Sequence, residues 1–289
     1  MVSAMGGRRR WLGRRRGSWY GLVLPPLVVT LALIFVLVPM AWAVLGSFKS
    51  EVEYREIPVH LVPRAWTLEA YRAVIAKTDL VRGFVNSAII ATIEVVAVLF
   101  TSSLAGYVFA RKLFWGKDAL FMFVLASTMI PFTMLLIPLY LMFVRIGITD
   151  SYLAVVLPTA ISAYGIFLCR QFIRGIPRDL FEAAVMDGAG DLRIYWQVVL
   201  PLSKPVLSAL AIFTLIQSIN DLLWPLVVLS SAEKSTLALV LAKVTLQGES
   251  IIFTQILAAV VLGSLPLVVA FLVLQRNFVR GIALTGIQG

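Results

Sequence analysis

Residues 20–45 read YGLVLPPLVVTLALIFVLVPMAWAVL, and no charged side chain interrupts this stretch. A helix of about 20 mostly apolar residues is long enough to cross the hydrocarbon core of a bilayer. Further apolar stretches follow along the chain, so that the predicted spans are residues 20–45, 84–110, 119–144, 152–168, 206–229 and 256–274. The pattern predicts an all-α integral membrane protein with six transmembrane helices.

The composition agrees with a chain that lies in lipid. Hydrophobic residues make up 60% of the chain and charged residues 14%, whereas soluble domains average about 45–50% and about 25%. The single cysteine, Cys169, excludes a disulfide scaffold, and the single histidine, His60, leaves few ligands for a metal. We therefore expect the chain to bind no metal and no cofactor.

The basic residues are distributed unevenly between the two sides of the predicted spans. Sixteen Lys and Arg fall on the side that carries both termini, and nine fall on the other side. The first group includes a basic tail at residues 1–19 and a long connection at residues 170–204. Cytoplasmic segments carry an excess of Lys and Arg. We therefore expect a multi-pass protein of the inner (plasma) membrane, with a transmembrane domain at residues 20–289 and both termini in the cytoplasm.

Two other classes of protein are excluded by the same observations. The net charge of +10 does not indicate nucleic-acid binding, because no folded basic face with stacking aromatic side chains is evident. An intramembrane enzyme would need a nucleophile beside a base, but His60 lies in a connection and no lysine lies in a span. The chain also lacks a phosphate-binding P-loop motif, so we expect no enzymatic activity.

Polar residues within the spans are candidates for a transport pathway. An ionisable side chain in a bilayer is unfavourable and therefore marks a functional site by default. Glu94 lies in the second predicted span, and Asn220, Asp221 and Trp224 lie near the end of the fifth. These residues either line a pathway or make hydrogen bonds that pack the helices. Pro131, Pro138, Pro225 and Pro266 are expected to kink their spans.

The connection at residues 170–204 predicts a helical hairpin. Pro177 can begin a helix, and Gly188 can end it because glycine adopts the left-handed conformation without strain. A second short helix is expected at residues 192–199, ending before Pro201. Leu180, Ala183, Ala184 and Asp187 share one face of the first helix. This face either docks into another protein or packs on the bundle of its own chain.

The hairpin also resembles a known motif. Glu182-Ala183-Ala184-Val185-Met186-Asp187-Gly188-Ala189, followed by Val199-Leu200-Pro201-Leu202-Ser203-Lys204-Pro205, is similar to the EAA motif of permease subunits in binding-protein-dependent ABC importers. Further segments resemble the carbohydrate-importer branch, in particular the second permease of maltose-type systems. These segments are Ser47-Phe48-Lys49, Phe84-Val85-Asn86-Ser87, Ile137-Pro138-Leu139-Tyr140, Asn220-Asp221-Leu222-Leu223-Trp224-Pro225-Leu226 and Gln275-Arg276-Asn277-Phe278-Val279-Arg280-Gly281.

The resemblance implies a type I ABC importer permease fold and a division of labour between subunits. It assigns contact with an ATPase to Glu182, Ala183, Ala184, Asp187, Gly188, Leu200 and Pro201. It also implies a second permease subunit, two cytoplasmic ATPase subunits and an extracytoplasmic solute-binding protein that meets residues 46–83 and 230–254. The expected substrate is a sugar or an oligosaccharide. The alternatives are an importer for another polar solute (a glycerophosphodiester, a sugar phosphate or a polyamine) and a secondary transporter.

Overall fold

The computed structural model describes residues 19–246 and 252–285, and these residues form helices without any β-strand. The helices are α1 (Trp19–Ser47), α2 (Glu51–Arg55), α3 (Glu69–Lys77), α4 (Leu80–Arg111), α5 (Lys117–Ser127), α6 (Phe132–Ile146), α7 (Tyr152–Val156), α8 (Ala163–Arg174), α9 (Arg178–Met186), α10 (Asp191–Ile194), the π-helix η1 (Tyr195–Val199), α11 (Leu200–Leu202), α12 (Lys204–Asn220), α13 (Leu223–Val228), the 3-10 helix η2 (Ala232–Lys234), α14 (Leu237–Leu246) and α15 (Phe253–Thr285). The predicted basic tail, residues 1–19, lies outside the described residues except for Trp19.

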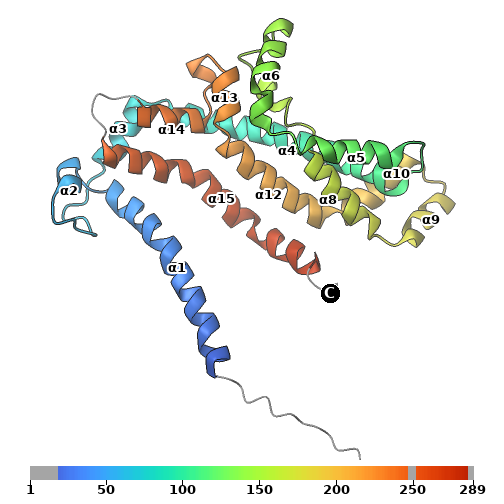
Figure 1. Cartoon of the computed structure of the whole chain (residues 1–289), viewed down its shortest axis with the longest axis horizontal. Coiled ribbons are helices and arrows are strands. Elements are labelled where there is room, and N and C mark those ends of the chain that lie inside the picture. Colours follow the sequence, from blue (N-terminus) through green and yellow to red (C-terminus); the bar gives the residue numbers. More distant parts are fainter. Residues whose placement is uncertain (1–18, 247–251, 286–289) are drawn as a thin grey trace, which may run out of the picture.

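Helix α4 is the central element of the bundle. It packs most extensively against α8 and α12, and α12 in turn packs against α15. Figure 1 shows α5, α9 and α10 gathered at one end of α4, and α2, α3 and α14 gathered at the other. We call the first the basic end, because α4 ends there at Arg111 and α8 ends there at Arg174. The second is called the opposite end.

Small residues allow α4 and α8 to approach closely. A Cβ atom on Gly106 would lie 2.6 Å from Cβ of Cys169, and a Cβ atom on Gly165 would lie 2.3 Å from Oγ of Ser102. Ser102 and Cys169 are completely buried. Small residues at such contacts are typical of helix packing within a membrane. The contact between α4 and α8 therefore depends on the absence of side chains at Gly106 and Gly165.

Two of the predicted spans correspond to long apolar helices. Residues 20–45 lie in α1 and residues 84–110 lie in α4, and both helices have the length and composition needed to cross a membrane. Residues 256–274 lie within α15, which continues through Pro266 without a break. The number of six spans stays a prediction.

The third predicted span, residues 119–144, is not one helix. The axes of α5 and α6 are bent by 96° relative to each other at residues 128–131. Pro131 has no N–H to donate, and its ring disfavours helical backbone at Ile130. A helix therefore ends before Pro131 and a new one begins at Phe132, whereas Pro138 is tolerated inside α6.

The fourth and fifth predicted spans, residues 152–168 and 206–229, are interrupted as well. Residues 157–162 separate α7 from α8, and the Ser162 hydroxyl begins α8 by accepting a hydrogen bond from the Gly165 N–H over 3.0 Å. Residues 221–222 separate α12 from α13. The predicted spans are therefore not continuous helices at either place, and at the first a polar cap, Ser162, begins a new helix within a segment that is apolar on average.

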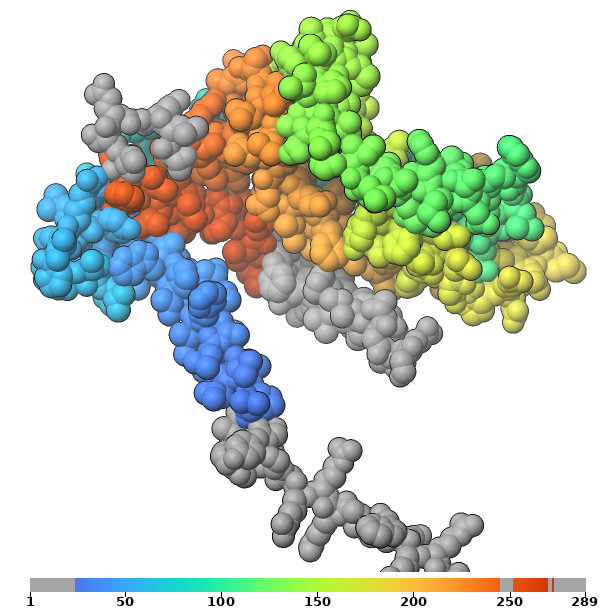
Figure 2. Space-filling view, in the orientation of Figure 1, coloured from blue at the N-terminus to red at the C-terminus, as the bar shows by residue number. Residues whose placement is uncertain are grey.

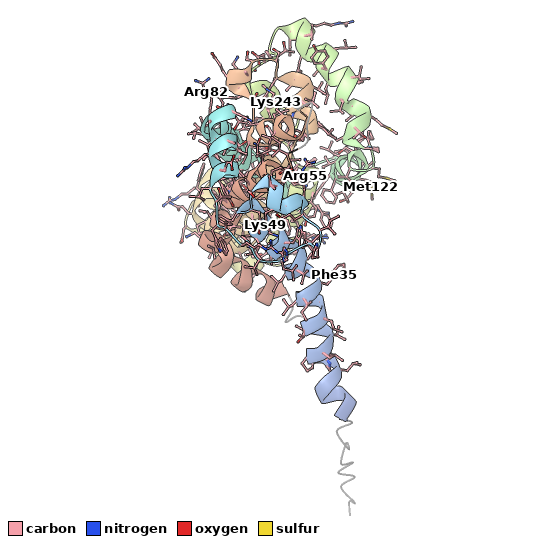
Figure 3. The ribbon with its side chains drawn as sticks, turned by 90° about the vertical axis from the view of Figure 1, so that its left-hand side faces the viewer. Phe35, Lys49, Arg55, Arg82, Met122 and Lys243 are labelled. Carbon is pink, nitrogen blue, oxygen red and sulfur yellow. The ribbon has the colours of Figure 1, made fainter. Side chains whose placement is uncertain are left out.

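Most of helix α1 projects away from the other helices, and only its C-terminal end packs against α15. Figure 2 shows it extending away from the bundle, and its residues 24–41 are exposed. The labelled Phe35 projects from α1 in Figure 3, with 81% of its surface exposed. An apolar surface of this size is stable only against lipid or against another protein chain.

The substitution Gly106→Val should destabilise the bundle. The added side chain would collide with Cβ of Cys169 and with the backbone N of Arg170, which lies 2.9 Å from the built Cβ position. Overpacking of this kind lowers the free energy of unfolding by about 1–3 kcal/mol. We expect a lower Tm for the purified protein in a thermal unfolding assay. Ala88→Val, at an exposed position of the same helix, is the control, and an equal Tm for both variants would contradict the packing role of Gly106.

Candidate functional site

The basic end carries an exposed helical hairpin, residues 177–203, which we call the basic-end hairpin. Its first limb, α9, ends in a Schellman motif. The Ala189 N–H donates to the Ala184 carbonyl and the Gly188 N–H donates to the Val185 carbonyl, both over 2.9 Å. Gly188 has a φ angle of +75°, which a residue with a side chain adopts only with strain. The helix therefore ends where the sequence predicts.

The end of α4 fastens the first limb to the bundle. The Phe181 ring stacks on the Tyr107 ring, with centroids 6.5 Å apart and an interplanar angle of 13°. The Arg111 guanidinium carbon lies 4.1 Å from the Phe181 ring centroid. Arg111 also donates hydrogen bonds to the carbonyls of Ile173, over 2.8 Å, and Ile176. One guanidinium therefore links α4, the end of α8 and α9, by charge-assisted hydrogen bonds and a cation–π contact.

The second limb is fastened to the same helix. Tyr195 is 1% exposed, and its hydroxyl lies 2.7 Å from Oγ of Ser103. The Lys112 ammonium donates to the Asp191 carboxylate, and this hydrogen bond raises the pKa of Lys112. Lys112 is therefore charged at neutral pH. Both limbs of the basic-end hairpin are thus held by residues of the last three turns of α4 or directly after them.

The two faces of α9 have different surroundings. Leu180 and Met186 are 45% and 86% exposed, and Ala183, Asp187 and Glu182 are exposed as well. Ala184 is half-buried and packs against the core cluster that contains Tyr107 and Tyr195. The sequence left open whether the face that carries both alanines docks into another protein or packs on its own bundle, and the structure separates the two alanines. Ala184 faces the bundle, while Leu180, Ala183 and Asp187 remain on the outside.

The second limb also differs from its prediction, because it does not end before Pro201. Helical backbone continues from Asp191 to Leu202 through the π-helix η1. The Leu200 N–H donates to the Tyr195 carbonyl, five residues earlier. A proline ring clashes with the carbonyl four residues before it in an α-helix, and the wider π-turn changes this local geometry. Pro201 is exposed, whereas Leu200 packs against the core.

The middle of the bundle contains a small polar cluster. Glu94 of α4 is 8% exposed, and its carboxyl group lies close to the hydroxyls of Thr159 and Ser218 and within the field of Asp221. The Ser218 hydroxyl is buried and makes no hydrogen bond of ordinary length and angle with described residues. Three separate stretches of the chain therefore bring polar side chains together here. The Ser218 hydroxyl among them remains able to form a further hydrogen bond.

Asp221 and Asn220 lie beside this cluster at the end of α12. Asp221 occupies the break between α12 and α13, and its Oδ1 lies 3.5 Å from the Trp224 N–H. Asn220 is exposed and donates to the Ile216 carbonyl of its own helix over 2.9 Å. Asn220 is therefore accessible in this chain, whereas Asp221 is half-buried.

The structure corrects the prediction for Trp224. Its ring is completely buried, and its Nε1–H donates to the Ala154 carbonyl over 2.9 Å. Phe132 and Phe143 meet the ring edge-on, with centroid distances of 6.0 and 5.6 Å. A buried indole with a satisfied N–H is typical of a core residue. Trp224 therefore packs α13 against α6 and α7 and presents no surface to a pathway.

A second constellation lies at the opposite end, where Asn86 holds the connection at residues 230–236. Asn86 is 4% exposed and donates to the carbonyls of Glu233, over 2.8 Å, and Ser235, over 2.9 Å. The Tyr152 hydroxyl donates to Asn86 Oδ1 over 2.8 Å. The neighbouring Ser87 hydroxyl accepts from the Leu237 N–H over 2.8 Å. The sequence marked Asn86 and Ser87 only through family resemblance, and not through this role.

Asp150 fastens the same connection from another side. Its carboxylate accepts hydrogen bonds from the N–H groups of Ser230 and Ser231, over 3.1 and 3.0 Å, and an ion pair joins it to Lys234 over 3.1 Å. Hydrogen bonds from Ser231, with Lys234 contributing, hold the pKa of Asp150 well below its usual range. A lowered pKa stabilises the fold above the unfolded pKa of about 3.9. These contacts are therefore fully formed between pH 5 and 8.

Glu51 ties α2 to the beginning of α15. Its carboxylate accepts hydrogen bonds from the N–H of Thr254, over 3.1 Å, and from the Thr254 hydroxyl, over 3.0 Å. Burial opposes ionisation, yet these bonds and one from Arg55 lower the pKa of Glu51. Figure 3 labels Arg55, the last residue of α2, and Lys49, which lies just before this helix. The loops of the opposite end are thus linked by charged side chains.

These features together define the class of the protein. Apolar helices of membrane length, a polar cluster within the bundle and a fastened helical hairpin at the basic end are typical of a membrane transport subunit. Within residues 19–246 and 252–285, no three metal-ligating side chains come together.

The chain belongs to the family of binding-protein-dependent transport system inner membrane components, whose sequence profile matches residues 102–284. It is similar to the arabinooligosaccharides transport system permease protein AraQ of Halalkalibacterium halodurans, with 34% identity over 255 residues, 87% of this chain and 91% of that protein. It is also similar to the sn-glycerol-3-phosphate transport system permease protein UgpE of Yersinia enterocolitica, with 29% identity over 262 residues, 88% of this chain and 93% of that protein.

The fold matches a solved transporter. The chain superposes on a permease chain from the crystal structure of a bacterial ABC transporter involved in the import of the acidic polysaccharide alginate. The TM-score is 0.80 at 25% identity, covering 90% of this chain and 96% of that chain. The predicted all-α permease fold is confirmed, and the protein is a transport subunit of the inner membrane and not an enzyme.

The substitution Asn86→Ala should release the connection at residues 230–236. Two carbonyls and the Tyr152 hydroxyl would lose their partner, and each buried polar group left unpaired costs about 1–3 kcal/mol. We expect faster cleavage of this connection when the purified transporter is treated with a protease in detergent. Asn220→Ala removes only a bond within one exposed helix end and is the control. Equal cleavage rates for the two variants would contradict the role of Asn86.

Proposed function

We propose that the protein is one of two permease subunits of an ATP-driven importer for a sugar or an oligosaccharide. The named relatives support a saccharide, because AraQ belongs to an arabinooligosaccharides system and the structural neighbour to an alginate importer. The expected assembly contains a second permease subunit, two cytoplasmic ATPase subunits and an extracytoplasmic solute-binding protein. The membership in a binding-protein-dependent family supports the last of these.

The observation that carries the proposal is the structure of the basic-end hairpin, in particular the two different faces of α9. One face of α9 is fastened to α4 through Phe181, and the other face exposes Leu180, Ala183 and Met186. An exposed apolar helix face that is rigidly attached to a bundle can dock into a groove of another protein. We infer that α9 seats in an ATPase subunit, where Glu182 and Asp187 make polar contacts, and that its movement is passed to α4.

The orientation follows from the same hairpin. If the ATPase is cytoplasmic, the basic end and both termini lie in the cytoplasm, as the excess of Lys and Arg on this side favours. The connections at residues 46–83 and 230–254 then face the solute-binding protein. The fixed arrangement of residues 230–236 by Asn86 and Asp150 suits a docking surface, because little ordering remains to be done on binding.

The polar cluster is the part of the transport pathway that we propose this subunit contributes. Glu94, Asn220 and Asp221 can accept or donate hydrogen bonds to hydroxyl groups of a sugar. Irregular backbone between α12 and α13 is tolerated at membrane depth only where it is buried in protein or lines a water-filled cavity. This location favours Asn220 and Asp221 as pathway residues over lipid-facing ones.

Two alternatives remain distinguishable by experiment. An importer for another polar solute is favoured by the similarity to UgpE, whose system carries sn-glycerol-3-phosphate. A secondary transporter would have no use for a hairpin that docks an ATPase.

The substitution Gly188→Val tests the coupling role. Valine at a φ angle of +75° is strongly strained, so the Schellman motif and the direction of the second limb should change. We expect ATP-dependent uptake in proteoliposomes of the assembled importer to fall at least about tenfold, while insertion into the membrane is retained.

Gly190→Val is the matched control for this substitution. A Cβ atom at Gly190 meets no atom within 4 Å, as at Gly188, but the φ angle of Gly190 is −74°. This variant should transport nearly as well as wild type. Full uptake by Gly188→Val would contradict the proposed coupling.

The substrate class is tested by uptake with the complete importer and its solute-binding protein. We expect ATP-dependent accumulation of labelled oligosaccharides, and much weaker accumulation of sn-glycerol 3-phosphate or a polyamine. The measurement is initial uptake rate per milligram of transporter, with and without ATP. Equal rates without ATP would favour a secondary transporter, and a preference for the phosphorylated solute would contradict a sugar.

A further inference from the structure

A cleft of about 560 Å³ lies between the end of α4, the beginning of α5, the end of α8 and the inner side of α9. Six basic side chains line it: Arg111, Lys112, Lys117, Arg170, Arg174 and Arg178. A volume of this size lies within the range of small-molecule sites in proteins. Arg111, Lys112 and Phe181 of this lining hold the basic-end hairpin, whereas the proposed transport function gives no role to Arg174 and Arg178.

The positive charge of the cleft is only partly compensated. Asp191 is paired with Lys112, and Asp118 lies 3.8 Å from Arg170. Glu182 is the remaining acidic side chain of the lining, and it forms no ion pair with any residue that the structure describes. Six basic groups thus face three acidic ones, and the cleft carries a net positive charge.

Arg174 and Arg178 are two of the four basic lining residues that have no ion pair among the described residues. Neither side chain makes a hydrogen bond or an ion pair within the described part of the chain, although both line the cleft. The charge of Arg178 also repels that of Arg111, whose buried Nε–H has no partner among the described atoms. Like charges that lie close together repel each other, and a bound anion would relieve this repulsion.

The loop beside the cleft points to the source of that anion. Residues 112–116 connect α4 to α5, and Leu113 and Trp115 are 93% and 100% exposed. Gly116, with a φ angle of +77°, reverses the chain after them. Exposed Trp beside basic residues is typical of the headgroup level of a membrane. A soluble surface would gain nothing from two fully exposed apolar side chains at this point.

We propose that this cleft binds the phosphate headgroup of an anionic phospholipid from the adjacent leaflet. Arg174 and Arg178 contact the phosphate, while Leu113 and Trp115 enter the acyl boundary beside it. With the orientation proposed above, this leaflet is the cytoplasmic one, whose anionic lipids attract basic clefts between helices. The bound lipid bridges α8 and α9, and it removes the repulsion between Arg111 and Arg178.

The test uses the purified complete transporter in a neutral detergent. Dioctanoyl phosphatidylglycerol is added as the probe, and Tm is recorded against its concentration. Inorganic phosphate and dioctanoyl phosphatidylcholine are tested in parallel. We expect phosphatidylglycerol alone to raise Tm of the wild-type complex.

The double variant Arg174→Gln/Arg178→Gln should need at least about tenfold more phosphatidylglycerol for the same rise. Both side chains are exposed and without partners among the described residues, so their replacement leaves no buried group unpaired. Arg72→Gln/Arg82→Gln is the control, because it removes the same charge from exposed positions at the opposite end, where Figure 3 labels Arg82. This control should retain the wild-type midpoint concentration.

Three results would overturn the proposal. Equal midpoint concentrations for the two double variants would show that the cleft is not the lipid site. A similar rise in Tm with inorganic phosphate would show a site for soluble anions. Loss of the ATPase subunits from purified Arg174→Gln/Arg178→Gln would show that the cleft is a protein contact.

Discussion

The whole arrangement depends on the packing of one unbroken helix, α4, against α8. Helix α4 has 32 residues and is therefore about 48 Å long, and the bare surfaces of Gly106 and Gly165 allow it to contact α8 directly. At one end, Tyr107 and Arg111 hold Phe181 of α9. At the other end, Asn86 holds the carbonyls of residues 230–236. A single rigid element thus carries contacts to both ends of the protein.

Much of this fold could be predicted from the sequence, because hydropathy reports directly on burial in lipid. Residues 20–45 and 84–110 lie in α1 and α4, and Gly188 ends α9 as expected because its conformation is fixed by local chemistry. The breaks at residues 128–131, 157–162 and 221–222 were missed or underestimated. A hydropathy average over about 20 residues is insensitive to a short break in a helix. Pro131 and Ser162 are the local sequence signals that indicate such breaks.

The candidate sites were harder to predict, because they depend on contacts between distant parts of the chain. Helical periodicity placed Ala183 and Ala184 on one face, but it could not show that the core around Tyr195 covers Ala184. A tryptophan such as Trp224 can lie either in a core or in a pathway, and the sequence does not distinguish these locations. The hydrogen bond from its Nε1–H to the Ala154 carbonyl identifies it as a core residue. Asn86 contacts carbonyls almost 150 residues away, which no single sequence reveals.

Two of the breaks that the sequence underestimated, at residues 157–162 and 221–222, lie beside the polar cluster, and these features have one physical origin. A backbone break within a membrane leaves N–H and C=O groups without helical partners, so it requires polar or aqueous surroundings. Thr159 comes from the break between α7 and α8, and Asp221 from the break between α12 and α13, and both lie near Glu94 of the continuous α4. A rigid helix thus meets two interrupted helices at one point. Rearrangement of the interrupted helices against α4 would change access to Glu94 without unfolding any long helix, which is the mechanical requirement for alternating access.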